Sequence, residues 1–149
     1  MLIGQDGNGF VVLLAQRPTV KPHAGRWEFP GGKVNPGESL MQALIREMYE
    51  EIKVLVKEKD MVLIEDTSPP ATTAQGIRLS LFLVQRWKGT PIGQEQQQVQ
   101  WVSSWLLPLW APTMPNLDRA QLPDVLLAIN SSNASTTTAK KAKFTINKW

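Results

Sequence analysis

The stretch "GGKVNPGESLMQALIREMYEE", Gly31 to Glu51, joins a glycine-rich loop to an amphipathic segment. Ser39 and Gln42 form a capping box at the start of that segment. The good helix formers that follow predict a helix from Leu40 to about Ile52. A loop that leads into one capped helix is therefore the element around which the rest of the chain is interpreted.

Three glutamates crowd onto one side of this helix: Glu47, Glu50 and Glu51 fall within a sector of about 100°. Like charges at these spacings destabilise a helix by roughly 0.2–0.5 kcal/mol per pair. Acidic residues in the last turn also oppose the helix dipole, by roughly 0.3–1 kcal/mol each. An exposed acidic face with Arg46 paired to Glu50 would tolerate these costs, so the helix alone does not decide between a solvated face and a site.

The glycines before the helix favour a site. Gly31 and Gly32 follow Glu28-Phe29-Pro30 at the end of a predicted strand, where a glycine backbone can turn sharply and expose carbonyl oxygens. Carboxylate and carbonyl oxygens are the ligands that Mg²⁺ or Mn²⁺ requires. We expect a divalent cation between the glutamates, because its charge would turn their repulsion into coordination.

Short apolar stretches separated by turn residues predict strands beside two helices. The "GQDGNG" segment is typical of a tight hairpin, and "TSPPATTAQG" is typical of a loop. A second helix is expected to start near Pro123 and to cover "DVLLAIN". The predicted strands are the end of one at "MLI", then "FVVLLAQR" (10–17), "MVLIED" (61–66), "IRLSLFLVQRW" (77–87) and, more weakly, "VQWVSS" (99–104). This order predicts a mixed α/β sandwich.

Composition limits the remaining possibilities. The 149 residues suit one domain, and the absence of cysteine excludes disulfides and thiolate sites. No apolar run of about 18 residues and no signal peptide are recognised, so we expect a cytoplasmic protein that does not enter a membrane. The net charge of +3 arises in the tail after residue 130, which holds four lysines and no acidic residue. We therefore expect a domain over residues 1–130, a disordered basic tail over 131–149, and no nucleic-acid polymer as partner.

The loop and helix resemble the signature of the Nudix hydrolases, which is a glycine, five residues, a glutamate, seven residues, and Arg-Glu-apolar-any-Glu-Glu-any-Gly-apolar. Lys53 stands where that family has a glycine, which usually ends the helix in a left-handed conformation costing another residue about 1 kcal/mol. The matching residues are Gly32, Glu38, Arg46, Glu47, Met48, Glu50, Glu51 and Val54.

Further blocks resemble the MutT-type 8-oxo-dGTP diphosphatases: "LLAQRP", "WEFPGGKVNPGES", "WKGTPIGQE" and "PNLDRAQLP". The resemblance implies a Nudix-type α/β/α sandwich around a mixed β-sheet. It also implies Mg²⁺-assisted attack of water on a phosphorus of a nucleoside triphosphate, with a monophosphate and pyrophosphate as products. Such a protein would be a monomer acting on a small nucleotide.

The same resemblance implies roles for individual residues. Glu47, Glu50 and Glu51 look like metal ligands together with the carbonyl of Gly31 or Gly32, and Glu47 is a candidate general base. The further implied roles are Glu95 as an additional ligand or alternative base, Arg46 as the group that orients the glutamates, Glu38 as a support of the loop-helix junction, Asn116 as the reader of the base, Phe29 as a lining of the base pocket and Arg17 as a nucleotide contact.

Three functions remain open at this point. The first is a hydrolase that removes 8-oxo-dGTP from the nucleotide pool, and the second is a Nudix hydrolase acting on CTP-like or dinucleotide substrates. The third is a binding module that keeps the fold without the chemistry. The intact set of Glu47, Glu50, Glu51 and Glu95 argues against the third, because a pure binder has no need to retain acids that repel one another.

Overall fold

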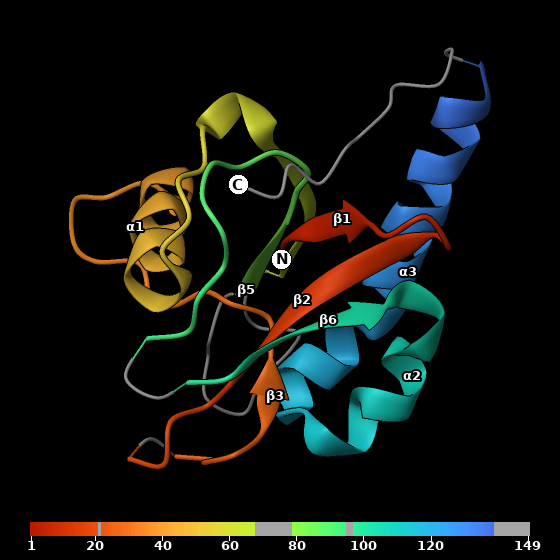
Figure 1. The fold of residues 1–149 in the computed structure, drawn as a ribbon. Coiled ribbons are helices and arrows are strands. Elements are labelled where there is room, and N and C mark those ends of the chain that lie inside the picture. The colour runs from red at the N-terminus through yellow and green to blue at the C-terminus, as the bar shows by residue number, and fades with distance from the viewer. Residues whose placement is uncertain (21, 68–78, 95–96, 139–149) are drawn as a thin grey trace.

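The computed structural model describes residues 1–20, 22–67, 79–94 and 97–138 (Figure 1). Strands and helices alternate in the order expected of a mixed α/β fold. The longer elements are β1 (Ile3–Gln5), β2 (Phe10–Gln16), β3 (Trp27–Glu28), α1 (Leu40–Ile52), β4 (Met61–Thr67), β5 (Leu79–Val84), β6 (Val99–Ser103), α2 (Leu107–Trp110) and α3 (Asn116–Thr138), with short 3₁₀ turns at η1 (Glu58–Asp60), η2 (Ser104–Leu106) and η3 (Ala111–Thr113).

The strands form two antiparallel groups that are joined edge to edge. β2 pairs with β1, β3 and β6, and β4 pairs with β5. A parallel bridge between Leu2 and Val84 connects the groups, and the amide of Val84 donates to the carbonyl of Met1 over 3.0 Å. The expected mixed sheet is therefore confirmed. The Asp-Gly and Asn-Gly pairs of residues 6–9 connect β1 to β2, as the hairpin pattern predicted.

Alternating side chains along the strands fill two separate cores. Val12 and Leu14 of β2 belong to the core that α3 covers, whereas Leu13 belongs to the core that α1 covers. The neighbouring β5 alternates in the same way, because Leu81 and Leu83 face α3 while Phe82 and Val84 face α1. Figure 1 shows α1 and α3 on opposite sides of the strands. The predicted α/β/α sandwich follows from this period of two.

Helix α1 begins and ends as the sequence predicts. The Ser39 hydroxyl accepts the amide of Gln42, and the Gln42 side chain accepts the amide of Ser39, which completes the capping box. Lys53 follows the last helical residue with φ 57° and ψ 32°, the left-handed conformation that the family's glycine favours. Its amide donates to the carbonyl of Tyr49 over 3.1 Å. The replacement of glycine therefore leaves this helix end intact.

The prediction for the last helix was wrong at both ends. Helix α3 starts at Asn116, well before Pro123, and its backbone continues to Thr138. It starts early because the amide of Arg119 donates to the carbonyl of Pro115 over 3.0 Å and because buried side chains already lie in its first turns. Residues 131–138, expected to be disordered, are helical. Residues 139–149 of the predicted tail lie outside the described residues.

None of the helices within the described residues is both long and apolar enough to cross a membrane.

Candidate active site

Arg46 is the centre of a cluster of carboxylates beside the glycine-rich loop. Its Nη2 lies 2.6 Å from Glu38 Oε1, and its Nε lies 3.2 Å from Glu38 Oε2. Its Nη1 donates to Glu47 Oε1 over 2.8 Å and to Glu50 Oε2 over 3.1 Å. The Nη2 also donates to the carbonyl of Lys33 over 2.8 Å. One guanidinium thus joins the loop to two of the three expected metal ligands.

The loop side of this cluster is held by Glu38. Its Oε1 accepts the amide of Asn35 over 2.6 Å, so the carboxylate links the loop backbone to Arg46. The hydrogen bonds from Arg46 and then from Asn35 keep the pKa of Glu38 below its ordinary value. The hydrogen bonds to Glu38 and Glu47 in turn raise the pKa of Arg46. Both groups are therefore charged at neutral pH, which lets Arg46 offset part of the glutamate repulsion.

Gly32 allows the carboxylate of Glu47 to approach the loop backbone. A Cβ atom at Gly32 would overlap the carboxyl carbon and both carboxyl oxygens of Glu47. The third glutamate, Glu51, also reaches the loop, because its Oε2 accepts the amide of Gly31 over 3.1 Å. The glycines thus bring the loop against the acidic side of the helix, as the sequence suggested.

The loop that carries Glu95 is anchored to the same end of α1. The amide of Gln94 donates to the carbonyl of Glu51 over 3.0 Å, and the amide of Ile92 donates to the carbonyl of Ile52 over 3.0 Å. Glu95 itself lies outside the described residues.

The donor chemistry of this cluster suits a hard divalent cation, since Glu47, Glu50 and Glu51 supply carboxylates and Gly31 and Gly32 supply carbonyls. The absence of a side chain at Gly32 lets the Glu47 carboxylate lie next to the loop carbonyls, which also suits cation binding. In the arrangement observed here, however, Arg46 and the loop backbone engage the glutamates. No group of three histidine, cysteine, aspartate or glutamate side chains in the described ranges is already drawn together as a metal site. The metal-ligand assignment therefore stays a prediction.

Arg17 and Glu28 form an ion pair between the end of β2 and the end of β3. Arg17 also donates through Nε to the carbonyl of Pro22 over 2.8 Å. These two contacts fix the side chain that the sequence assigned to the nucleotide. Arg17 directly follows β2, which pairs with β3, the strand that runs into the glycine-rich loop, so its position is compatible with that assignment.

Asp118 is a residue that the sequence interpretation missed. Its Oδ1 accepts the amide of Phe29 over 2.9 Å, across 89 residues of sequence. Burial, with a smaller effect from the charge of Glu28, raises the pKa of Asp118 to about 6. A mostly buried acid tied to the expected pocket residue Phe29 is a candidate for ligand recognition. Only its place two residues after Asn116 could have marked it in the sequence.

Asn116, the predicted base reader, is exposed on the first turn of α3. Its Oδ1 accepts a hydrogen bond from Arg119 Nη2 over 2.7 Å. Asn116 and Phe29 are both connected to α3 near Asp118, Phe29 through its amide and Asn116 through the helix itself. Phe29 and Asn116 thus both lie near the start of α3, where the carboxyl group of Asp118 accepts the amide of Phe29.

Comparison with known proteins places this site in a family. The NUDIX domain profile matches residues 1–125. A CTP pyrophosphohydrolase of Escherichia coli (strain K12) is 37% identical over 102 residues, which are 68% of this chain and 71% of the relative. An 8-oxo-dGTP diphosphatase of Proteus vulgaris is 43% identical over 77 residues, or 52% of this chain and 66% of the relative.

A solved structure agrees with the sequence relatives. It comes from work on MutT of Aliivibrio salmonicida and Vibrio cholerae, and it superposes with a TM-score of 0.66 at 31% identity over 79% of this chain and 86% of that chain. Together with the glycine loop, the helix and the carboxylates around Arg46, these likenesses lead to one conclusion. The chain belongs to the Nudix family and is a Nudix pyrophosphohydrolase.

Proposed function

We propose that this protein hydrolyses nucleoside triphosphates to a monophosphate and pyrophosphate with Mg²⁺, and that 8-oxo-dGTP is its preferred substrate. The observation that carries the proposal is the contact between Gly32 and the carboxylate of Glu47, next to the ion pairs of Arg46. The relative from Proteus vulgaris that is named 8-oxo-dGTP diphosphatase supports the choice of substrate. The role would be to clear an oxidised nucleotide before DNA replication, in a monomeric cytoplasmic protein.

Glu47, Glu50 and Glu51 would hold the metal, together with a carbonyl of the glycine-rich loop. When bound, Mg²⁺ or Mn²⁺ neutralises phosphate charge and lowers the pKa of water. Glu47 would take the proton of the attacking water, with Glu95 as the alternative base. Arg46 keeps Glu47 and Glu50 in place through ion pairs of 2.8 and 3.1 Å, so that their orientation does not depend on the substrate.

The base would lie at the start of α3 beside the buried ring of Phe29. An Asn116 carboxamide released from Arg119 offers both a donor group and an acceptor oxygen, which suits an oxidised purine whose N7 has become a donor. Asp118, held by the amide of Phe29, would add an acceptor in its ionised form and a donor in its protonated form. Arg17 would contact the nucleotide from the end of β2.

CTP is the second candidate substrate. A carboxylate accepts hydrogen bonds, so an ionised Asp118 would suit the amino group of cytosine. The relative at 37% identity is named CTP pyrophosphohydrolase. If Asn116 stays bound to Arg119 in the complex, Asp118 is left as the base reader and the preference shifts towards CTP. Dinucleotide hydrolysis and nucleotide binding without chemistry are the remaining alternatives.

Pyrophosphate release with Mg²⁺ separates these possibilities. The substrates are 8-oxo-dGTP, dGTP, CTP, 5-methyl-dCTP, ADP-ribose and NADH, each measured as kcat/KM for the wild-type protein and for Asn116→Ala. We expect 8-oxo-dGTP to be hydrolysed best, and we expect Asn116→Ala to reduce the preference for 8-oxo-dGTP over dGTP more than it reduces hydrolysis of either.

The outcomes are distinct. A preference for CTP would keep the chemistry and transfer base reading to Asp118. An unchanged ratio of 8-oxo-dGTP to dGTP in the Asn116→Ala protein would remove Asn116 from the pocket. No hydrolysis of any substrate by a protein with a cooperative thermal transition would leave the binding module as the explanation.

A further inference from the structure

The charges of this protein are divided between two regions, although their totals nearly balance. The described residues carry ten lysines and arginines against twelve aspartates and glutamates, because six of the sixteen cations and one of the thirteen acids of the chain lie outside them. Half of the ten cations lie on two short segments, residues 53–60 and 86–88. We call them the basic surface: Lys53, Lys57, Lys59, Arg86 and Lys88.

The basic surface is strongly cationic relative to its surroundings. Only Glu58 and Asp60 are acidic within these segments, so their net charge is +3. The other described residues carry five cations and ten acids, a net charge of −5. The net charges of the domain and of the tail led us to expect no nucleic-acid polymer as partner. A net charge does not show that cations and acids lie in separate regions of the domain. A cationic surface on an otherwise acidic molecule attracts polyanions selectively to one place.

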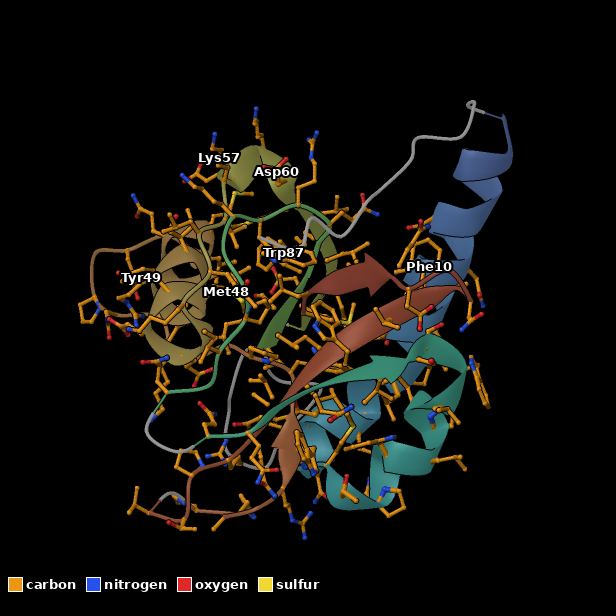
Figure 2. All side chains as sticks on the ribbon, viewed as in Figure 1. Phe10, Met48, Tyr49, Lys57, Asp60 and Trp87 are labelled. Carbon is orange, nitrogen blue, oxygen red and sulfur yellow. The ribbon has the colours of Figure 1, made fainter. Side chains whose placement is uncertain are left out.

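Backbone pairing holds the two segments side by side. Leu55 and Lys88 form an antiparallel bridge in which each amide donates to the other residue's carbonyl over 2.9 Å. Further along, Arg86 Nη2 lies 2.6 Å from Asp60 Oδ1. All five cationic side chains are exposed. In Figure 2, Lys57 and Asp60 appear together at one end of the molecule, next to α1. The cations therefore form one surface.

A hollow of about 280 Å³ lies within the basic surface. Lys59, Arg86 and Gln85 line it and carry hydrogen-bond donors. Val62 and Asp60 complete the lining, Asp60 pairs with Arg86, and the net charge of the lining is +1. This volume and these donors suit a phosphate group with part of its sugar. None of the lining residues belongs to the cluster around Arg46, so the hollow is separate from the candidate active site.

An exposed aromatic ring adjoins the cations. Tyr49 is 50% exposed on α1, and Lys53 Nζ lies 4.9 Å from the centre of its ring. Figure 2 shows Tyr49 on the outward side of the helix. Proteins that bind single-stranded nucleic acids combine cations that follow the backbone with aromatic rings on which bases stack. A duplex would keep its bases away from such a ring, so a single strand is the nucleic acid that can use both the cations and the ring.

We propose that the basic surface binds the backbone of a single-stranded nucleic acid and that Tyr49 stacks on one of its bases. This interaction does not depend on the proposed hydrolysis of nucleotides, because the basic surface shares no residue with the carboxylate cluster. The hollow lined by Lys59, Gln85 and Arg86 receives one phosphate, and Lys57 and Lys88 neutralise its neighbours.

Fluorescence anisotropy of a labelled 20-nucleotide single strand tests the proposal, with DNA and RNA measured separately from 50 to 200 mM salt. Removing two cations with Lys57→Gln and Lys59→Gln should make the slope of log K against log salt shallower by about 1.4, since each contact contributes about 0.7 on single strands. Binding at 50 mM salt should weaken at least tenfold. Tyr49→Leu should weaken it several-fold, and the matched control Lys33→Gln should bind as the wild type does.

Two comparisons can overturn the proposal. The four lysines of the tail are a rival explanation, so Lys140, Lys141, Lys143 and Lys148 are changed together to Gln. If this tail variant loses binding while the Lys57/Lys59 variant keeps the wild-type slope, the basic surface is not the site. Binding to phosphatidylserine vesicles without binding to either single strand would also refute it. Hydrolysis of nucleotides by the Lys57/Lys59 variant should equal that of the wild type, which keeps this test independent of the proposed function.

Discussion

Arg46 binds both carboxyl oxygens of Glu38, eight residues before it in the chain, at 2.6 and 3.2 Å. Because Glu38 also accepts the amide of Asn35, this pair connects the loop to the helix that carries the glutamates. A planar guanidinium makes such a two-point contact and still has Nη1 available for Glu47 and Glu50. The geometry of the acidic side of α1 therefore depends on a residue outside the helix.

Glu38→Gln should lower kcat by about ten- to hundredfold, because Arg46 would lose its charged anchor and the glutamates would shift relative to the loop. Stability should change little, since solvent screens an ion pair that is partly exposed. Steady-state pyrophosphate release and the thermal midpoint report the two effects. Wild-type kcat in a folded Glu38→Gln protein would show that this anchor does not position the catalytic groups.

Gly32→Ala should inactivate the protein by displacing the Glu47 carboxylate, because the added Cβ would overlap the carboxyl group. A shift of about 1 Å in a catalytic group can cost about a hundredfold in rate. The rate and its dependence on Mg²⁺ concentration should be measured together. A fall in kcat with a raised Mg²⁺ requirement is expected, whereas an unchanged metal requirement would argue that Glu47 is not a ligand.

Glu50→Gln should abolish hydrolysis with little loss of folding. Arg46 pairs with Glu38, Glu47 and Glu50, and Glu50 is the most exposed of them, with 58% of its side chain accessible. Replacing its carboxylate by the amide of glutamine therefore costs little in packing. It removes one negative charge from the expected metal site. Binding of Mn²⁺, followed by its electron paramagnetic resonance signal, should weaken in parallel. Near-normal rates in Glu50→Gln would remove this residue from the metal site.

Lys53→Gly should stabilise the protein by about 0.5–1 kcal/mol. Glycine adopts φ 57° without the cost of about 1 kcal/mol that a side chain brings, although the contact of Lys53 with Tyr49 is lost. Lys53→Ala is the matched control, because it loses the same contact and keeps the unfavourable conformation. Urea unfolding should rank Gly above Lys and Lys above Ala. Equal stability of the Gly and Ala proteins would show that the left-handed conformation carries no cost here.

The sequence predicted the features that depend on neighbouring residues better than those that depend on residues far apart in the chain. The capping box, the helix from Leu40 to Ile52 and the strand predicted over residues 10–17 follow from neighbouring residues. All are confirmed, and the strand ends one residue earlier, at Gln16. The start of α3 was misplaced because Pro123 is an acceptable first residue of a helix and nothing nearby in sequence marks Asn116 as an earlier one. Polar spacing alone could not show that this helix would continue past Ser131.

The residues of the candidate site also differ in how well the sequence predicted them. The Nudix spacing located the glutamates and Arg46, since that part of the site lies within one loop and one helix. The hydrogen bond between Phe29 and Asp118 spans 89 residues, and the ion pair of Arg17 with Glu28 joins two strands. Neither contact has a spacing that a single sequence reveals. The missed contacts are therefore those that strand pairing or the packing of α3 on the sheet brings together.

Asp118→Asn should stabilise the protein at neutral pH and change how its stability depends on pH. Burial raises the pKa of Asp118 to about 6 from an ordinary value of 3.8. Below pH 3.8 the carboxyl group is neutral in the folded and unfolded states alike. Between pH 4 and 6 the folded state holds a proton that the unfolded state has lost, so stability falls as pH rises. Above pH 7 both states are ionised, and the native state bears the full cost of the buried charge, up to about 3 kcal/mol.

The asparagine keeps an oxygen that can accept the amide of Phe29, and it cannot ionise. The free energies of unfolding of the wild type and Asp118→Asn should therefore be similar at pH 4 and diverge towards pH 7.5, with the variant more stable. Urea unfolding at intervals of half a pH unit measures this difference directly, and the pH effects of groups that do not interact with Asp118 cancel in it. A difference that stays constant from pH 4 to 7.5 would mean that Asp118 ionises in the folded protein as it does in the unfolded chain. Its burial would then not restrain its charge, and the case for Asp118 as a tuned group beside the base would fail.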